Sequence, residues 1–291
     1  MATRSQWLAG ARPRTLPAAI APVLLGTAIA QYENSFRFSI AICALIVALA
    51  LQVGVNYAND YSDGIRGTDD IRIGPVRLVG QKLASAESVK RAAGLFFLVA
   101  GCAGLAMSVL SHMWVLIPIG VSAIISAWFY TGGTRPYGYA GLGEVFVFTY
   151  FGLVAVCGTS ASQSGHISTL SVLAGVSCGL LSTAILIANN LRDIPSDSTA
   201  GKKTLAVRLG DTNTRRLYIG AVTAGITLSL ALATHGPQLA FVGIFAFALA
   251  FAPIRTVFHG ATGRQLIPVL IGTGRTLLIY SLIVSFGILN S

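Results

Sequence analysis

Charge is scarce in this sequence. Of 291 residues only 10% are charged and 54% are hydrophobic, and the mean hydropathy is +0.73. A soluble domain carries about 25% charged residues. This composition excludes an ordinary water-soluble domain and predicts an integral membrane protein.

Cysteine and histidine are also rare, at four residues each. The cysteines stand singly within apolar segments, and none has the spacing of a metal-binding or redox motif. The histidines fall singly in predicted connections without a second ligand beside them in the sequence. We therefore expect neither a zinc site nor a redox centre, and we interpret the cysteines as packing residues.

Apolar runs, by contrast, recur along the whole chain. A helix needs about 20 mostly apolar residues to cross a bilayer. We expect no cleavable signal peptide, and we predict an all-α integral membrane protein with a single domain, residues 1–291, and nine transmembrane helices. The predicted spans are residues 15–32, 39–58, 92–110, 113–130, 141–158, 169–189, 217–234, 238–254 and 266–289.

The positive charge is unevenly distributed. Eighteen of the 20 Lys and Arg residues lie in alternate connections, whereas the opposite connections hold only Arg37 and the last span holds Arg275. By the positive-inside rule, the N-terminus and the basic connections are predicted to be cytoplasmic and the C-terminus to lie outside. The net charge of +10 therefore indicates membrane topology and local anion sites, not nucleic-acid binding. Arg275 is expected either to face a polar interior or to mark the membrane interface.

Acidic residues number only ten, and six of them gather in two regions. Asn56 precedes Asp60 by four residues, and Asn189 precedes Asp193 by four residues, each at the end of an apolar run. This spacing places an amide and a carboxylate one helical turn apart on one face. Each pair begins a long predicted cytoplasmic stretch, about 59–91 and 190–216. The six acids are Asp60, Asp63, Asp69, Asp70, Asp193 and Asp197.

Two such clusters predict a metal site. One motif alone would be as typical of a solvated helix end, but two copies at matching helix ends favour a shared function. Carboxylate and amide oxygens suit Mg²⁺ or Mn²⁺, and Mg²⁺ usually binds through one or two carboxylates plus substrate phosphates. We predict two Mg²⁺ ions, replaceable by Mn²⁺, with the ligands Asn56, Asp60, Asp63, Asn189, Asp193 and Asp197.

Basic residues beside both motifs predict an anionic substrate. A diphosphate held above apolar helices suits a lipid tail, so the expected reaction is ionisation of an allylic prenyl diphosphate, with metal ions and cations stabilising the leaving group. Nearby tyrosines either contact the resulting carbocation or belong to an interfacial aromatic belt. The basic residues are Arg66, Arg135, Arg192, Lys202 and Lys203, and the tyrosines are Tyr57, Tyr61, Tyr130 and Tyr150.

These motifs resemble those of the UbiA superfamily of membrane prenyltransferases, and the resemblance covers nearly the whole chain. Asn59-Asp60-x-x-Asp63 is similar to the first aspartate-rich motif of the family, and Asp193-x-x-x-Asp197 to the second. The resemblance implies nine helices in a bundle with a central cavity open to the cytoplasmic side. Several strings resemble the actinobacterial type of the branch that acts on 1,4-dihydroxy-2-naphthoate in menaquinone synthesis: residues 11–17, 56–70, 74–79, 130–139, 189–197 and 202–208.

The resemblance also implies roles for individual residues. Tyr130 and Arg135 match a family tyrosine and basic residue that contact the prenyl group and the diphosphate. Arg135 replaces a frequent lysine but can still grip phosphate bidentately, and Gly67 stands where many members have a third acid. The expected catalytic residues are Asp60, Asp193, Tyr130 and Arg135, and the expected substrate contacts are Asn59, Arg66, Tyr130, Arg135, Tyr150, Arg192, Lys202 and Lys203.

The implied reaction joins a polyprenyl chain to the naphthoate ring with loss of its carboxylate, giving demethylmenaquinone and diphosphate at a bacterial cell membrane. Arg12, Arg14 or Arg77 is expected to hold the substrate carboxylate. The expected partners are these two substrates and membrane lipid, and no feature indicates an oligomeric state. The alternatives are another aromatic acceptor, such as 4-hydroxybenzoate, or a cation-coupled transporter, whose acids would lie near the bilayer midplane.

Overall fold

Apolar runs separated by short polar connections fold into helices throughout the part of the chain that the structure describes. The computed structural model describes residues 2–67 and 76–291, so Asp69 and Asp70 lie outside the described residues. The elements are α1 (Arg4–Gly10), η1 (Pro13–Thr15), α2 (Pro17–Tyr32), α3 (Phe38–Ile65), α4 (Ala86–Ser111), α5 (Leu116–Phe129), η2 (Tyr137–Ala140), α6 (Gly143–Val147), η3 (Phe148–Val154), α7 (Ala155–Ser164), α8 (Thr169–Thr199), α9 (Leu205–Thr234), η4 (Gln238–Ala246), α10 (Phe247–Phe258), η5 (Gly263–Leu266) and α11 (Ile267–Leu289).

Within the described residues, seven helical segments are long and apolar enough to cross a membrane. An eighth arises if Arg4–Thr15 and Pro17–Tyr32, which meet at a 50° bend, form one span. The predicted span 113–130 corresponds to α5, which has only 14 residues. The count of nine is therefore not confirmed, because α2 and α5 are shorter than the roughly 20 residues that a straight crossing requires. Each of the nine predicted segments nevertheless coincides with helix.

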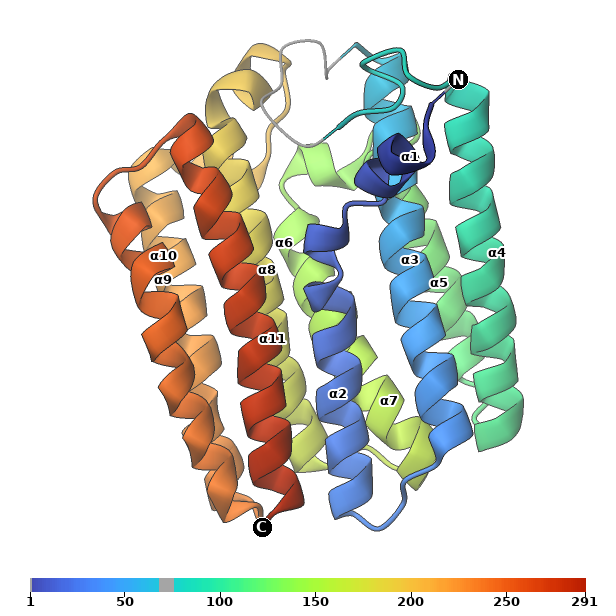
Figure 1. The fold of residues 1–291 in the computed structure, drawn as a ribbon, viewed down its shortest axis with the longest axis vertical. Helices are drawn as coiled ribbons and strands as arrows, with labels where there is room; N and C mark the ends of the chain where they lie inside the picture. Colours follow the sequence, from blue (N-terminus) through green and yellow to red (C-terminus); the bar gives the residue numbers. More distant parts are fainter. Residues whose placement is uncertain (1, 68–75) are drawn as a thin grey trace.

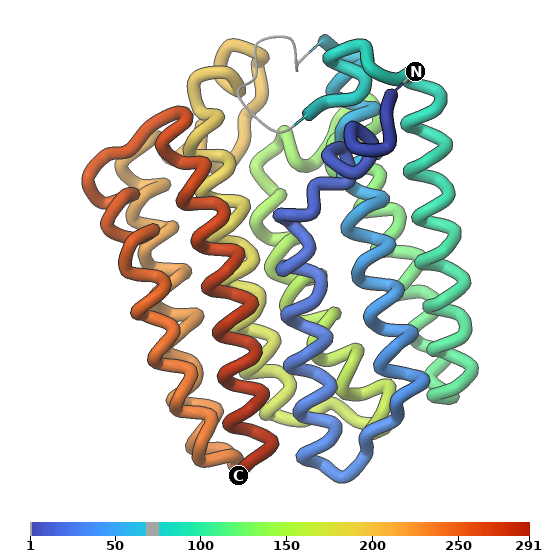
Figure 2. The backbone as a smooth tube through the Cα atoms, viewed as in Figure 1, coloured from blue at the N-terminus to red at the C-terminus, as the bar shows by residue number. Residues whose placement is uncertain are grey.

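The long helices run side by side along the bundle (Figure 1). The ends of α3 at Ile65 and α8 at Thr199 lie at the same end of the molecule, which we call the motif end. The N-terminal helix also lies there, and the C-terminus lies at the opposite end (Figure 2). The two aspartate motifs are thus brought to one end of the bundle although four predicted spans separate them in the sequence.

Both motifs lie within helices. The predicted non-spanning stretches, 59–91 and 190–216, begin as helix, since α3 continues to Ile65 and α8 to Thr199. A helix of 28 residues, the length of α3, is about 42 Å long. It therefore extends beyond a hydrocarbon layer of about 30 Å, and its polar last turns can stand at the membrane surface.

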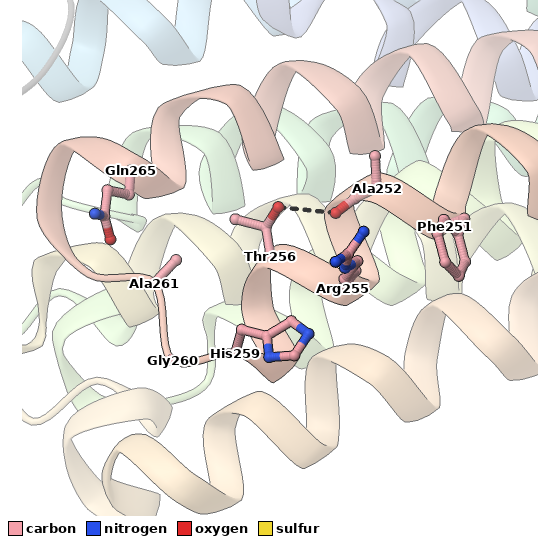
Figure 3. Close-up of a pocket in the computed structure, with 8 residues that line it drawn as sticks. All are labelled: Phe251, Ala252, Arg255, Thr256, His259, Gly260, Ala261 and Gln265. Carbon is pink, nitrogen blue, oxygen red and sulfur yellow. Dashed lines mark hydrogen bonds between the residues drawn. The ribbon is translucent and has the colours of Figure 1, made fainter.

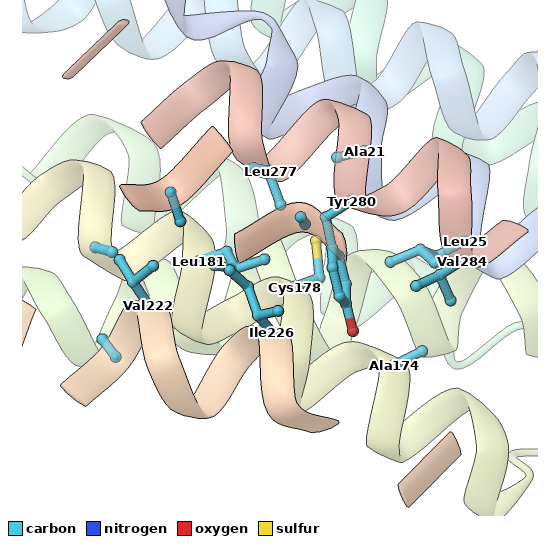
Figure 4. Packing of buried hydrophobic residues seen from close by; sticks show 14 of the residues in the cluster. Ala21, Leu25, Ala174, Cys178, Leu181, Val222, Ile226, Leu277, Tyr280 and Val284 are labelled. Atoms are coloured by element: carbon cyan, nitrogen blue, oxygen red, sulfur yellow. The ribbon is translucent and has the colours of Figure 1, made fainter. Parts of the chain in front are cut away.

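The largest apolar cluster joins α8, α9 and α11, with α2 against it (Figure 4). Leu181, Ile226 and Leu277 are fully buried there. The Ser177 hydroxyl donates to the carbonyl oxygen of Gly225 at 2.6 Å and lies 2.7 Å from the Tyr280 hydroxyl. This packing fixes the position of α8, which carries the second motif. Arg275 of α11 is exposed and so is not part of this core.

Gly152 sets the distance between the π-helical turn η3 and α8. A Cβ atom on Gly152 would lie 2.4 Å from the Cα atom of Gly179 and 2.5 Å from the carbonyl oxygen of Gly175. Because both contacts are with backbone, Gly152→Ala is expected to lower the free energy of unfolding by about 1–3 kcal/mol. Thermal unfolding in detergent measures this change. The matched control is Gly158→Ala, where a Cβ meets nothing within 4 Å, and equal melting temperatures for the two variants would contradict the packing argument.

Candidate active site

The first motif is held by the chain segment that follows it. The Asp60 carboxylate is 1% exposed and accepts hydrogen bonds from the backbone N–H groups of Leu78 at 2.7 Å and Val79 at 3.1 Å. The segment can approach this closely because Gly64 has no side chain, and a Cβ there would lie 2.5 Å from Val79. The motif therefore faces the protein interior at the motif end.

Asp63 is the point at which the two motifs meet. It accepts a hydrogen bond from the Tyr139 hydroxyl, and its Oδ2 atom lies 3.7 Å from an Arg77 nitrogen. The Lys202 ammonium lies 3.6 Å from Asp63 Oδ1 and 4.0 Å from Asp197 Oδ1. One cation thus bridges the last acid of the first motif and the last acid of the second.

Backbone hydrogen bonds position the Lys202 ammonium. The Lys202 N–H donates to the Asp197 carbonyl at 2.8 Å, and the Lys203 N–H donates to the Tyr139 carbonyl at 2.9 Å. The ammonium lies 4.3 Å from the centre of the Tyr139 ring, a cation–π arrangement. Tyr139 therefore contacts both Asp63 and Lys202, although sequence reasoning assigned it no role.

The first acid of the second motif, Asp193, pairs with its neighbour in the sequence, Arg192. Arg192 donates from Nε at 2.7 Å and from a terminal nitrogen at 2.8 Å to the two oxygens of Asp193, forming a bidentate pair. The same guanidinium donates to Asn189 at 2.9 Å. Arg192 is 7% exposed and Asp193 3%. Removing only one partner of such a pair strongly destabilises the folded protein, because the other charge stays buried without a partner.

The donor set fits a shared metal site. Four buried carboxylates, on Asp60, Asp63, Asp193 and Asp197, face three buried cations, Arg77, Arg192 and Lys202. In the described part of the chain no three Asp, Glu, His or Cys side chains converge tightly enough to hold an ion by themselves. Mg²⁺ usually takes only one or two carboxylates and completes its coordination with water and phosphate oxygens. The acids therefore fit Mg²⁺ that is bound together with a phosphorylated ligand.

The amides and Arg66 of the first motif are engaged elsewhere in this structure. The Asn56 side chain donates to the Ala11 carbonyl at 2.9 Å and to the Thr15 hydroxyl at 3.0 Å. It thereby fastens the turn between α1 and α2 onto α3. The Asn59 Oδ1 atom accepts a hydrogen bond from Thr131, and Arg66 donates to carbonyls of the connection after α5.

An aromatic row begins in that connection and continues into α6 and η3. Tyr130 contacts Tyr137 edge-on with ring centres 5.6 Å apart, Tyr137 stacks on Phe146 at 4.0 Å, and Phe146 stacks on Tyr150 at 6.2 Å. The Tyr150 hydroxyl lies 3.0 Å from that of Ser122. Burial raises the pKa of Tyr137, and the nearby Tyr150 raises it further. Tyr137 is therefore neutral at ordinary pH.

Two predicted cationic contacts lie at the rim. Arg135 and Lys203 are exposed, and neither forms an ion pair with a described acid. A buried acid that sequence reasoning did not single out lies deeper. The Asn190 side chain donates to Glu144 Oε1 at 2.9 Å, and Glu144 is 6% exposed. The neighbouring asparagines of the second motif therefore face different partners, Asn189 toward Arg192 and Asn190 toward Glu144.

The chain is similar to known proteins over most of its length. The chain is 51% identical over 287 residues to 1,4-dihydroxy-2-naphthoate octaprenyltransferase of Mycobacterium tuberculosis, covering 98% of this chain and 97% of the relative. It is 41% identical to the Escherichia coli enzyme of the same name, covering 78% and 75%.

A solved structure of a UbiA homolog from Archaeoglobus fulgidus bound to GPP and Mg²⁺ superposes with a TM-score of 0.72 at 13% identity. The match covers 98% of this chain and all of that chain. At this identity the likeness indicates a shared fold. The model of the UbiA prenyltransferase family matches residues 19–269. The chain is therefore a member of the UbiA prenyltransferase family, a family of membrane-embedded transferases.

Proposed function

We propose that this protein transfers a polyprenyl group from a polyprenyl diphosphate to 1,4-dihydroxy-2-naphthoate with loss of the ring carboxylate. The product is the reduced form of demethylmenaquinone, released with diphosphate and carbon dioxide. The relatives from M. tuberculosis and E. coli carry this activity in their names and support the acceptor. We place the reaction at the cytoplasmic face of a bacterial cell membrane, because the basic connections gather at the motif end.

One observation carries the proposal. The Lys202 ammonium lies within 4.0 Å of both Asp63 and Asp197, so the two motifs form one site. A site of two carboxylate pairs and buried cations at the end of an apolar bundle is suited to a lipid diphosphate. Acids in a cation-coupled transporter lie near the membrane midplane, whereas these lie in the last turns of α3 and α8.

We propose that Asp60 and Asp63 hold one Mg²⁺ and that Asp193 and Asp197 hold a second. Asn56 and Asn189 stay predicted ligands through their Oδ1 atoms; the Asn56 Nδ2 atom donates to Thr15, and the Asn189 Oδ1 atom accepts from Arg192. When bound, the metal ions would stabilise the negative charge that develops on the leaving diphosphate. The structure of the A. fulgidus homolog with GPP and Mg²⁺ supports this choice of metal.

The chain's own cations act on the same leaving group. Arg192 and Lys202 are buried beside the acids, and both can turn toward a diphosphate once metal ions take the carboxylates. Lys203 and Arg135 are exposed at the rim and are placed to attract the anion first. The aromatic row that begins at Tyr130 offers ring faces to the carbocation and excludes water from it.

The acceptor must bring its carboxylate close to this charge. Of the three arginines predicted to bind it, Arg77 lies beside Asp63 at 3.7 Å and is 6% exposed. Arg12 and Arg14 flank the turn that Asn56 fastens to α3. All three therefore stay candidates, and Arg77 contacts the first motif directly.

Product analysis tests the acceptor. Purified protein in liposomes with Mg²⁺ and a polyprenyl diphosphate is expected to prenylate 1,4-dihydroxy-2-naphthoate and to release one diphosphate and one carbon dioxide per turnover. 4-Hydroxybenzoate is the matched comparison, because it presents a carboxylate and a hydroxyl on a smaller ring. A prenylated benzoate without a prenylated naphthoate would refute the naphthoate assignment and leave the prenyltransferase assignment intact.

A further inference from the structure

A cavity of about 590 Å³ lies away from the two motifs, beside the connection between α10 and α11 (Figure 3). This connection is also at the motif end of the bundle, on the side formed by α9, α10 and α11 (Figure 1). The side chains that line it include Phe251, Ala252, Arg255, Thr256, His259 and Gln265. The proposed reaction uses none of them.

The cavity is amphiphilic along one helix face. Phe251, Arg255 and His259 follow one another at intervals of four residues, which places them in one row with a rise of about 6 Å per step. The row therefore passes from an aromatic ring through a guanidinium to an imidazole as α10 approaches the motif end. The order matches the acyl chain, phosphate and headgroup of a phospholipid lying against the helix.

The wall of the cavity faces outward from the bundle. Phe251 of the cavity wall is 64% exposed, and it belongs to a helix segment long and apolar enough to cross the membrane. Phe258, on the same segment but outside the cavity lining, is 72% exposed. Large exposed aromatic side chains on such a segment lie against lipid and not against water. The occupant of the cavity is therefore an amphiphile that enters from the bilayer.

No acid in the described part of the chain pairs with the cation of the cavity. Arg255 is exposed and forms no ion pair with a described acid. The acid close to this connection, Asp211, is engaged by Arg215 at 2.6 Å and 2.7 Å. Arg215 also donates to the carbonyls of Val257 and Ala261, which ties down the connection and satisfies the end of α10. The cavity is thus a cationic site beside a connection that Arg215 holds in place.

From these observations we propose that the cavity binds the headgroup of an anionic phospholipid, with the phosphate at Arg255 and an acyl chain along Phe251. Each basic residue at the membrane surface strengthens the binding of anionic lipid about fivefold. The site is separate from the proposed prenyl diphosphate site, so it stands whether or not the acceptor is a naphthoate.

Native mass spectrometry of the full chain tests the proposal. Protein is purified from mixed phosphatidylglycerol and phosphatidylcholine micelles and then stripped of loosely bound lipid. We expect the wild-type chain to retain phosphatidylglycerol preferentially and Arg255→Gln to lower its occupancy about fivefold. The matched control is Arg91→Gln, which removes the same charge from an exposed residue of α4 and is expected to retain lipid as the wild type does. Unchanged thermal unfolding of both variants shows that folding is intact.

Three outcomes would overturn the proposal. They are equal retention of phosphatidylcholine and phosphatidylglycerol, equal losses in the two arginine variants, and displacement of the lipid by excess inorganic phosphate. The last result would identify the cavity as a site for a free anion, because a lipid held also along Phe251 is not displaced by phosphate alone.

Discussion

Asp193→Asn is expected to lower the rate of prenyl transfer about a thousandfold, a loss typical of removing a group that stabilises charge in a transition state. Asp193 is 3% exposed and accepts a bidentate hydrogen bond from Arg192. An asparagine carries no charge for a metal ion and offers one acceptor oxygen in place of two. The initial rate in liposomes, with saturating Mg²⁺ and both substrates, measures the loss.

The same substitution leaves the Arg192 charge buried without its partner, which by itself destabilises a fold by about 3–5 kcal/mol. A double variant, Arg192→Gln with Asp193→Asn, separates folding from catalysis. It removes both charges and is expected to melt closer to the wild type while remaining inactive. Recovery of activity in the double variant would mean that Asp193 serves only to neutralise Arg192.

A matched control lies outside the motifs. Asp211 accepts a similar bidentate hydrogen bond from Arg215, but it is 53% exposed. Asp211→Asn is expected to retain a rate within about twofold of the wild type, because a surface pair of this kind contributes little. If Asp193→Asn kept more than a tenth of the wild-type rate, the assignment of Asp193 to the metal site would be wrong.

The parts of the site that lie within one helix follow from the sequence. The four-residue spacing of Asn56 and Asp60, and of Asn189 and Asp193, is local and needs only helical geometry. The alternation of basic connections likewise predicts that both motifs lie at the same end, as Figure 1 shows. The nine predicted segments all correspond to helix, since an apolar run of membrane length has few other ways to satisfy its backbone.

The contacts between helices could not be read from the sequence. Tyr139 reaches Asp63 across 76 positions, and no periodicity relates them. The Asn56 Nδ2 atom donates to the Thr15 hydroxyl and the Ala11 carbonyl, more than 40 positions earlier in the chain, and no spacing predicts these contacts. A buried amide satisfies whichever donors and acceptors packing brings near it, and that choice depends on the tertiary fold. The apolar runs likewise do not show where the helices end, because the polar last turns of α3 and α8 continue beyond them.

Lys202→Met is expected to change metal binding and diphosphate binding in opposite directions. The Lys202 ammonium lies between Asp63 and Asp197, in a position where it competes with a divalent cation for the same oxygens. Without it, Mn²⁺ alone is expected to bind at least about tenfold more tightly, since a charge-assisted contact contributes roughly 1.5–3 kcal/mol. The diphosphate is expected to bind at least about tenfold more weakly, because it loses the cation that turns toward it.

This opposition also predicts cooperativity in the wild-type chain. A metal ion that displaces Lys202 leaves a buried ammonium without a partner, and a diphosphate supplies that partner. Mn²⁺ and diphosphate should therefore each strengthen the binding of the other by the same factor, as linkage requires. Electron paramagnetic resonance of Mn²⁺, titrated with and without diphosphate, measures the factor without any turnover.

Two comparison variants make the result specific to Lys202. Lys203→Met removes an adjacent but exposed ammonium that forms no ion pair with a described acid. It is expected to leave Mn²⁺ binding in the absence of diphosphate unchanged. Lys202→Arg keeps the charge and is expected to keep the cooperativity. Weaker Mn²⁺ binding in Lys202→Met, with diphosphate absent, would show that the ammonium organises Asp63 and Asp197 for the metal and does not compete with it.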